Sequence, residues 1–127
     1  MEKETPRKKI GAIIIRLDGY IDRMKERKRY VLFKMESADS EDVSREYAKR
    51  ANEIEKTTSL LRFYANALET TLKELEEGEV GTAIKIIDNV IENAKGNMPE
   101  IAIELEKIKK EMLEVKSKIQ LETVKEV

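Results

Sequence analysis

The sequence contains no cysteine and no histidine among its 127 residues. Without cysteine there is no disulfide framework, no thiolate metal site and no cysteine nucleophile. Without histidine the chain lacks the commonest general base and the commonest metal ligand. No glycine loop of the phosphate-cradling type is present, and no serine or lysine stands beside a base that would activate it. We therefore expect a protein that is not an enzyme and that uses no metal or other cofactor.

Long apolar runs are also missing. The most apolar stretch, residues 10–17, is interrupted by Gly11 and Arg16 and is far shorter than the roughly 20 residues that a membrane span needs. The sequence shows no signal-peptide core followed by a cleavage site of small residues. The expected location is therefore the cytoplasm.

Turn formers and aromatic residues are scarce. The chain has five glycines, two prolines and 5% aromatic residues, whereas 40% of its residues are charged. Ala, Glu, Lys, Leu and Ile dominate, a mixture typical of long helices with a narrow apolar seam. No segment alternates between polar and apolar residues with the period of a strand. The composition thus predicts an all-α fold.

Four segments carry apolar residues at alternating spacings of four and three, the pattern of a helix packed along one seam. Seven of the eight seam positions in the first segment are apolar, eight of nine in the second, and all six in the last. The seam positions are Ile10, Ile14, Leu17, Ile21, Met24, Lys28, Val31 and Met35; Tyr47, Ala51, Ile54, Thr58, Leu61, Ala65, Leu68, Leu72 and Leu75; Val80, Ile84, Ile87, Ile91 and Ala94; and Ile101, Leu105, Ile108, Met112, Val115 and Ile119.

Start and stop signals frame these segments. Thr5-Pro6 marks a helix start, Asp39 or Ser40 caps a second helix, Gly78 ends it in a left-handed cap position, and Pro99 opens the last helix. The predicted helices span residues 6–37, 40–77, 79–95 and 98–125 of a single domain, 1–127. Because the first connection is short, the second helix should fold back on the first. The expected fold is a long antiparallel helical hairpin followed by shorter helices.

Apolar residues also occur off the seams, and a two-helix hairpin cannot bury them all. Some should pack against the last two helices, and the rest are candidates for contacts between copies. These residues are Ile13, Ile15, Leu32, Phe33, Leu60, Phe63, Tyr64, Ile86, Val90, Ile103 and Leu113.

Charge is distributed unevenly along the chain. Residues 1–35 carry 11 Lys and Arg against 5 Asp and Glu, and residues 36–127 carry 14 against 21. Such a split indicates an element that faces a polyanion, a head-to-tail contact between copies, or both. The basic residues of the first helix include the clusters Arg7-Lys8-Lys9 and Arg27-Lys28-Arg29 and a seven-residue repeat of Lys9, Arg16 and Arg23, flanked by Arg27 and Lys34.

Three interpretations of these basic residues remain open. They form a solvated face balanced by acids of the second helix, they bind anionic lipid headgroups, or they contact nucleic-acid phosphates. Sequence-selective reading of nucleic acid is not expected, because the chain has no Trp and only two Phe on which bases could stack. The acidic run at residues 74–79 lacks the spacing of a calcium loop and is interpreted as a solvated helix end.

The order of these features resembles the ESCRT-III family, and the archaeal cell-division branch of CdvB-like proteins is the most similar. The basic first helix (residues 14–34), a short acidic turn and a second helix beginning near Tyr47-Ala48 carry the resemblance. So do Leu60-Leu61 through Leu68-Glu69, Leu72, Leu75-Glu76 and Gly78, and Met98-Pro99-Glu100-Ile101 followed by Leu105-Glu106. The similarity covers roughly residues 8–120.

The resemblance implies an ESCRT-III-like four-helix core that forms filaments, alone or with paralogues, for membrane remodelling or scission in cell division. It implies a peripheral location at the inner membrane surface or division site, where the basic face meets membrane or a neighbouring subunit. The residues expected at that contact are Arg7, Lys8, Lys9, Arg16, Arg23, Arg27 and Lys34. Gly78 and Gly81 would flank a hinge between the second and third helices.

A AAA ATPase disassembles polymers of this family, but the printed sequence, which ends at Val127, does not contain the family's docking motif. Two other functions stay open. One is a coiled-coil adaptor or scaffold of fixed oligomer state. The other is a nucleic-acid-associated protein that uses the basic helix.

Overall fold

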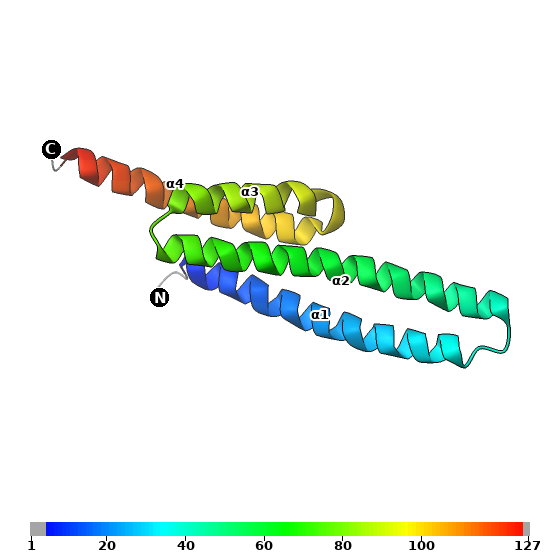
Figure 1. Ribbon diagram of the computed structural model, residues 1–127. Coiled ribbons are helices and arrows are strands. Elements are labelled where there is room, and N and C mark those ends of the chain that lie inside the picture. Colours follow the sequence, from blue (N-terminus) through cyan, green and yellow to red (C-terminus); the bar gives the residue numbers. More distant parts are fainter. Residues whose placement is uncertain (1–4, 126–127) are drawn as a thin grey trace. The chain divides into compact units, whose positions relative to one another are not determined.

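The computed structural model describes the backbone of residues 5–125 and the side chains of residues 5–116. In this range the chain is all-helical, with four helices in chain order: α1 (Pro6–Glu36), α2 (Glu41–Glu76), α3 (Val80–Asn97) and α4 (Pro99–Lys125) (Figure 1). No strand occurs between residues 5 and 125. The predicted all-α class is therefore confirmed, and each helix begins and ends within two residues of its expected position.

Side-chain caps explain where the first two helices begin. The Lys8 backbone N–H donates to Thr5 Oγ1 at 3.3 Å, and the Val43 N–H donates to Ser40 Oγ at 3.3 Å. Each hydroxyl satisfies an N–H that has no partner within its own helix. Of the two caps that the sequence allows for α2, the structure uses Ser40, while Glu41 and Asp42 occupy the first turn, where the helix dipole favours negative charge.

The chain divides into two compact units. Within the described range, unit 1 comprises residues 5–14 and 66–125, and unit 2 comprises residues 15–65. The boundaries therefore fall inside α1 and α2 and not at a loop. The expectation of a single domain stays a prediction.

Unit 1 is built around α3 and α4, which pack against each other. Six residues of α3 are buried, as are the α4 residues Ile101, Leu105, Ile108 and Met112. Ion pairs join the two helices at their rim, from Lys109 to Asp88 and from Lys95 to Glu106. The seams predicted for these two segments thus form a core.

The last two seam positions of α4, Val115 and Ile119, do not belong to the described core. Val115 was expected in the core but is 45% exposed. Gly81, the second residue of α3, already lies beside Lys116, since a Cβ there would meet Lys116 Nζ at 3.5 Å. Helix α4 therefore runs past the start of α3 at this point, and Val115 falls at the margin of the core. Ile119 lies outside the described side chains.

Unit 2 contains the remaining parts of α1 and α2. Val31 clusters with Ala51 and Ile54, and Met24, Leu32 and Tyr47 pack against that cluster. Later residues of α1 thus lie against earlier residues of α2. Off the seams, Ile13, Tyr64 and Val90 are buried, whereas Ile15, Phe33, Phe63, Ile103 and Leu113 are exposed.

Gly78 ends α2 in the left-handed conformation that the sequence predicts, with a φ of 81°. The Glu79 N–H donates to Glu74 O at 2.8 Å and the Gly78 N–H donates to Leu75 O at 3.2 Å. This pair of bonds is a Schellman motif, which satisfies two carbonyls at the helix end. Gly81 is helical, and both glycines belong to unit 1, so the hinge between α2 and α3 stays a prediction.

Substitution of Gly78 and of Gly11 by alanine should change stability in opposite directions. Gly78→Ala is expected to cost about 1–2 kcal/mol of unfolding free energy, because an L side chain is disfavoured at positive φ. Gly11→Ala should add about 0.5–1 kcal/mol, because Gly11 is helical and an added Cβ meets nothing within 4 Å. Urea unfolding followed by circular dichroism measures both. A stabilising Gly78→Ala would contradict the left-handed cap.

Candidate functional site

A continuous stripe of cations and tyrosines runs along one face of α1 in unit 2. It consists of Arg16, Tyr20, Arg23, Arg27, Tyr30 and Lys34, and we call it the Arg/Tyr stripe. The spacings alternate between four and three residues, so the side chains emerge from one face of the helix. None of the six positions is acidic. The structure therefore brings together the four cations that the sequence analysis selected between residues 15 and 65.

Aromatic rings contact two of the four cations of this stripe. The Arg23 guanidinium lies 5.3 Å from the centre of the Tyr20 ring, and Lys34 Nζ lies 5.6 Å from that of Tyr30. The charge of each cation is attracted to the face of its ring. The Tyr30 residue is nonetheless 61% exposed, so it remains accessible from solution. The sequence analysis did not select the tyrosines, although their spacing from the arginines could have revealed them.

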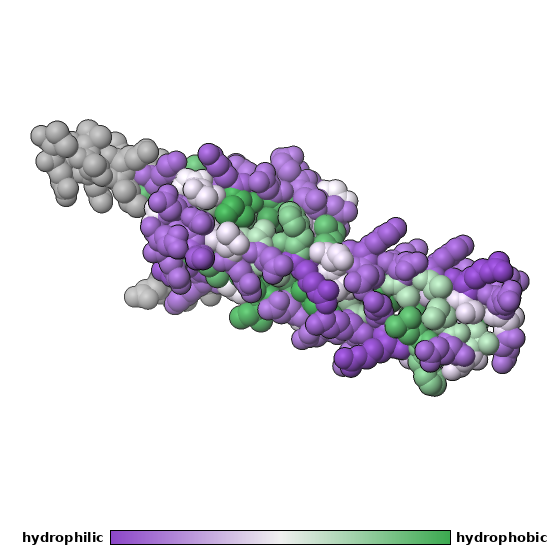
Figure 2. Space-filling model, viewed as in Figure 1, coloured by the Kyte–Doolittle hydropathy of each residue, from purple (hydrophilic) through white to green (hydrophobic). Residues whose placement is uncertain are grey.

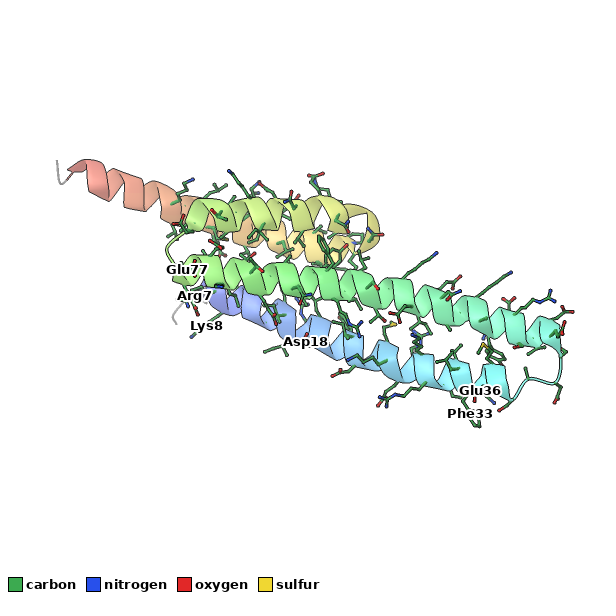
Figure 3. All side chains as sticks on the ribbon, in the orientation of Figure 1. Arg7, Lys8, Asp18, Phe33, Glu36 and Glu77 are labelled. Carbon is green, nitrogen blue, oxygen red and sulfur yellow. The ribbon has the colours of Figure 1, made fainter. Side chains whose placement is uncertain are left out.

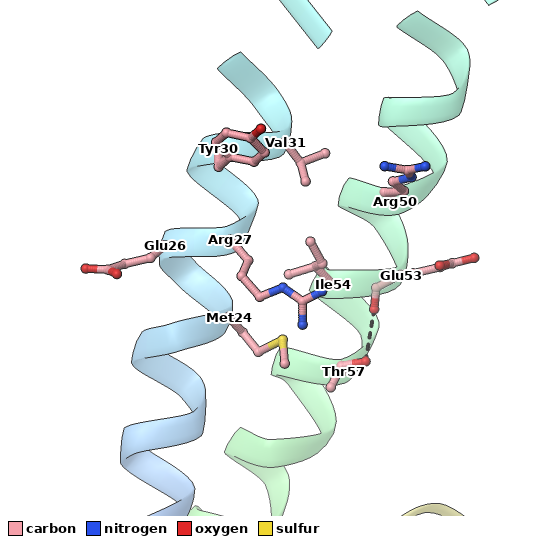
Figure 4. Close-up of a pocket in the computed structure, with 9 residues that line it drawn as sticks. All are labelled: Met24, Glu26, Arg27, Tyr30, Val31, Arg50, Glu53, Ile54 and Thr57. Atoms are coloured by element: carbon pink, nitrogen blue, oxygen red, sulfur yellow. Dashed lines mark hydrogen bonds between the residues drawn. The ribbon is translucent and has the colours of Figure 1, made fainter. Parts of the chain in front are cut away.

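A pocket of about 600 Å³ opens between α1 and α2 at the middle of the stripe. Met24, Val31 and Ile54 supply apolar lining, and Arg27, Tyr30, Arg50 and Thr57 supply polar groups. In Figure 4 the Arg27 side chain extends from α1 toward α2, whereas Glu26 and Glu53 point away on either side. The lining of this first pocket thus contains two arginines and two glutamates, and the side chains of both glutamates are directed away from Arg27.

Arg50 extends the basic surface onto α2. Its guanidinium lies 5.4 Å from the centre of the Tyr47 ring, which repeats the cation and tyrosine arrangement of the stripe. The Thr57 hydroxyl donates to the Glu53 carbonyl at 3.1 Å, so this hydroxyl proton is not available to a ligand in the pocket.

The cations at the start of α1, Arg7, Lys8 and Lys9, belong to unit 1, and two of them have acidic partners there. Arg7 Nη2 lies 3.1 Å from Glu76 Oε1, and Lys9 Nζ pairs with Glu111 Oε1. Figure 3 shows Arg7 and Lys8 at this first turn of the helix. The Arg7 pair is well exposed, and such pairs add little to stability.

A second pocket, of about 350 Å³, also lies in unit 2. Lys25, Lys28, Arg29 and Leu32 line it from α1, and Glu55, Thr58 and Arg62 line it from α2. Lys28 Nζ donates to Glu55 Oε2 at 2.7 Å. This hydrogen bond, the positive charge of Lys28 and the more distant charge of Arg62 together hold the pKa of the Glu55 carboxyl below its ordinary value. The sequence analysis selected neither Lys25 nor Arg62.

Exposed apolar side chains complete the surface of unit 2. Hydrophilic side chains cover most of the described surface in Figure 2, and apolar side chains show between them. Phe33, three residues after Tyr30, is 64% exposed and points away from α2 in Figure 3. An exposed aromatic side chain next to cations suits the surface of an anionic membrane. There the cations can contact the headgroups and the ring can enter the apolar layer below them.

Two other classes of site are absent from the described residues. No group of three or more Asp or Glu side chains among them could hold a metal ion. Over the same part of the chain, no helix is long and apolar enough to cross a membrane. No protein-family model, no curated protein and no solved structure matches the sequence or the fold.

Proposed function

We propose that this chain is a non-enzymatic, filament-forming subunit that remodels membranes, of the kind that its resemblance to the ESCRT-III family implies. The observation that carries the proposal is the Arg/Tyr stripe of α1. In this proposal α1 and α2 act as one antiparallel hairpin, and the stripe meets an anionic membrane surface. The scission event of archaeal cell division is the process that the resemblance favours.

Electrostatics and side-chain chemistry both support the membrane contact. Each Lys or Arg near an anionic leaflet contributes about 1 kcal/mol of binding free energy, so the four cations of the stripe are enough for reversible attachment. Tyrosine has an apolar ring and a polar hydroxyl, which suits it to the headgroup layer. Exposed Phe33 adds an apolar side chain beside Tyr30. These features support attachment of the chain to a membrane surface.

Exposed apolar residues elsewhere support contacts between copies. Ile103, Leu113 and Val115 of α4 and Phe63 of α2 are all exposed. Burying such side chains against a neighbouring subunit would remove apolar area from water and favour assembly. A polymer also multiplies weak membrane contacts, because each added subunit brings another stripe to the same surface. Disassembly by a AAA ATPase and opening at Gly78 and Gly81 belong to the same proposal.

Negative-stain microscopy of the purified chain, with and without anionic vesicles across a salt series, tests the proposal. We expect filaments or coated, deformed vesicles that disappear at high salt, because salt screens the cations of the stripe. Neutral phosphatidylcholine vesicles are the matched control and should stay bare.

Either of two results would replace this function. Small particles of constant size at every concentration, with bare vesicles, would indicate a coiled-coil adaptor of fixed oligomer state. Salt-sensitive binding to duplex DNA that anionic vesicles do not compete away would indicate a nucleic-acid-associated protein.

A further inference from the structure

The two polar interruptions of the apolar seams meet in one place. Lys28 is the exception among the eight seam positions of α1, and Thr58 is the exception among the nine of α2. Both line the second pocket. A leucine at either position would continue the apolar seam, so the fold alone does not call for a lysine and a threonine there. Because both polar seam residues line the same pocket, we infer that this pocket has a function other than helix packing.

The second pocket carries more positive charge than its acids neutralise. Its lining contains four cations, Lys25, Lys28, Arg29 and Arg62, against the single carboxylate of Glu55. Lys28 is already paired with that carboxylate. Among the described residues, no ion pair or hydrogen bond joins the side chains of Lys25, Arg29 or Arg62 to a partner. Four cations therefore share one carboxylate in this pocket, and Arg62 acts on that carboxylate together with Lys28.

We propose that the second pocket binds a compact anion that carries two or more phosphate groups. Its volume of about 350 Å³ suits a small ligand and not an extended chain. Arginine guanidinium groups match phosphate oxygens in two-point hydrogen bonds, and Arg29 and Arg62 approach the pocket from different helices. Lys28, which is paired with Glu55, lines the same pocket.

The buried threonine fits this arrangement. Thr58 is buried, and its hydroxyl donates to the Ile54 carbonyl at 2.8 Å. Its proton is thus used inside α2, while its small side chain leaves room that a leucine would fill. The anion has two chemical sources, a free polyphosphate or the headgroup of a phosphorylated inositol lipid. The proposal stands apart from the membrane function, because the pocket shares no cation with the Arg/Tyr stripe.

Isothermal titration of the full chain with inorganic tripolyphosphate at low salt tests the second pocket. We expect saturable binding of one anion per chain, which Arg29→Glu together with Arg62→Glu weakens by more than about tenfold, since each reversal removes a charge-assisted contact. Arg45→Glu with Lys49→Glu is the matched control, because these two exposed cations of α2 line neither pocket. The control should bind as the unchanged chain does.

Lys28→Leu separates ligand binding from a structural role. We expect weaker tripolyphosphate binding and an unchanged or higher Tm, because leucine continues the apolar seam. Equal binding by the unchanged chain, Lys28→Leu and the Arg29/Arg62 variant would overturn the proposal. The membrane function is tested by a different variant, in which Arg16, Arg23 and Arg27 are reversed. This variant should lose vesicle binding but leave tripolyphosphate binding intact.

Vesicles distinguish the two sources of the anion. Two kinds of phosphatidylcholine vesicle of equal charge are compared, one containing phosphatidylinositol bisphosphate and the other phosphatidylserine. If the chain prefers the first kind and tripolyphosphate competes this binding away, the pocket binds a lipid headgroup. Binding of tripolyphosphate without such a preference assigns it to a free polyphosphate. Binding of duplex DNA but not of tripolyphosphate, lost in the Arg29/Arg62 variant, would overturn the compact anion in favour of nucleic acid.

Discussion

Simultaneous reversal of Arg16, Arg23 and Arg27 to glutamate should abolish co-sedimentation with anionic vesicles. At about 1 kcal/mol per cation, loss of the three attractions alone weakens binding by more than about a hundredfold. The three new carboxylates add repulsion from the leaflet. Because all three residues are exposed, the variant should keep the helix content and Tm of the unchanged chain. Vesicle co-sedimentation and circular dichroism measure the two effects.

The matched control reverses three cations on another surface of the same unit. Arg45, Lys49 and Lys56 are exposed on α2, and none of them lines either pocket. Their reversal changes the net charge by the same amount and should leave most vesicle binding in place. If this control lost binding as completely as the stripe variant, binding would depend on net charge and the stripe would have no special role. Unchanged binding and assembly in the stripe variant would refute the membrane contact.

Leu105→Ala should lower the unfolding free energy of unit 1 by about 2–5 kcal/mol. Leu105 is fully buried on α4. Truncation removes apolar contacts and leaves a cavity that the packed helices fill only in part. Urea unfolding followed by the helix signal at several concentrations of protein measures the effect and separates it from any change in assembly.

Ile103→Ala provides the control on the same helix. Ile103 lies two residues before Leu105 but is 56% exposed, so its truncation should change the unfolding free energy by less than about 0.5 kcal/mol. Because Ile103 is a candidate for contacts between copies, its loss should reduce filament formation more than stability. Equal costs for the two substitutions would mean that α4 does not bury the predicted face.

Helix positions were predictable because the signals are local. Thr5, Ser40 and Gly78 act within a few residues of themselves, and each lies at a helix end in the structure. The choice between Asp39 and Ser40 as the cap of α2 was not predictable, since both side chains can accept the same N–H and their order in the turn decides between them.

Only those residues of the candidate site that follow a repeat along α1 were predictable from the sequence. A spacing of seven residues along one helix was enough to select Arg16 and Arg23, because residues of one helix keep fixed relative directions. Lys25 and Arg62 escaped selection, since they meet only when two segments far apart in the chain lie side by side. The polar exceptions at Lys28 and Thr58 were visible in the sequence, but their shared pocket was not.

By itself, the sequence determined the all-α class, the ends of the helices and the face that each helix buries. These follow from backbone hydrogen bonding and from a repeat of apolar residues, both of which act over a few turns. Only the tertiary structure decided that Lys28 pairs with Glu55, that four cations share the second pocket and that Val115 lies at a margin. Those outcomes depend on how one helix is aligned along another, and that alignment is set by the packing of many side chains together and not by any one local signal.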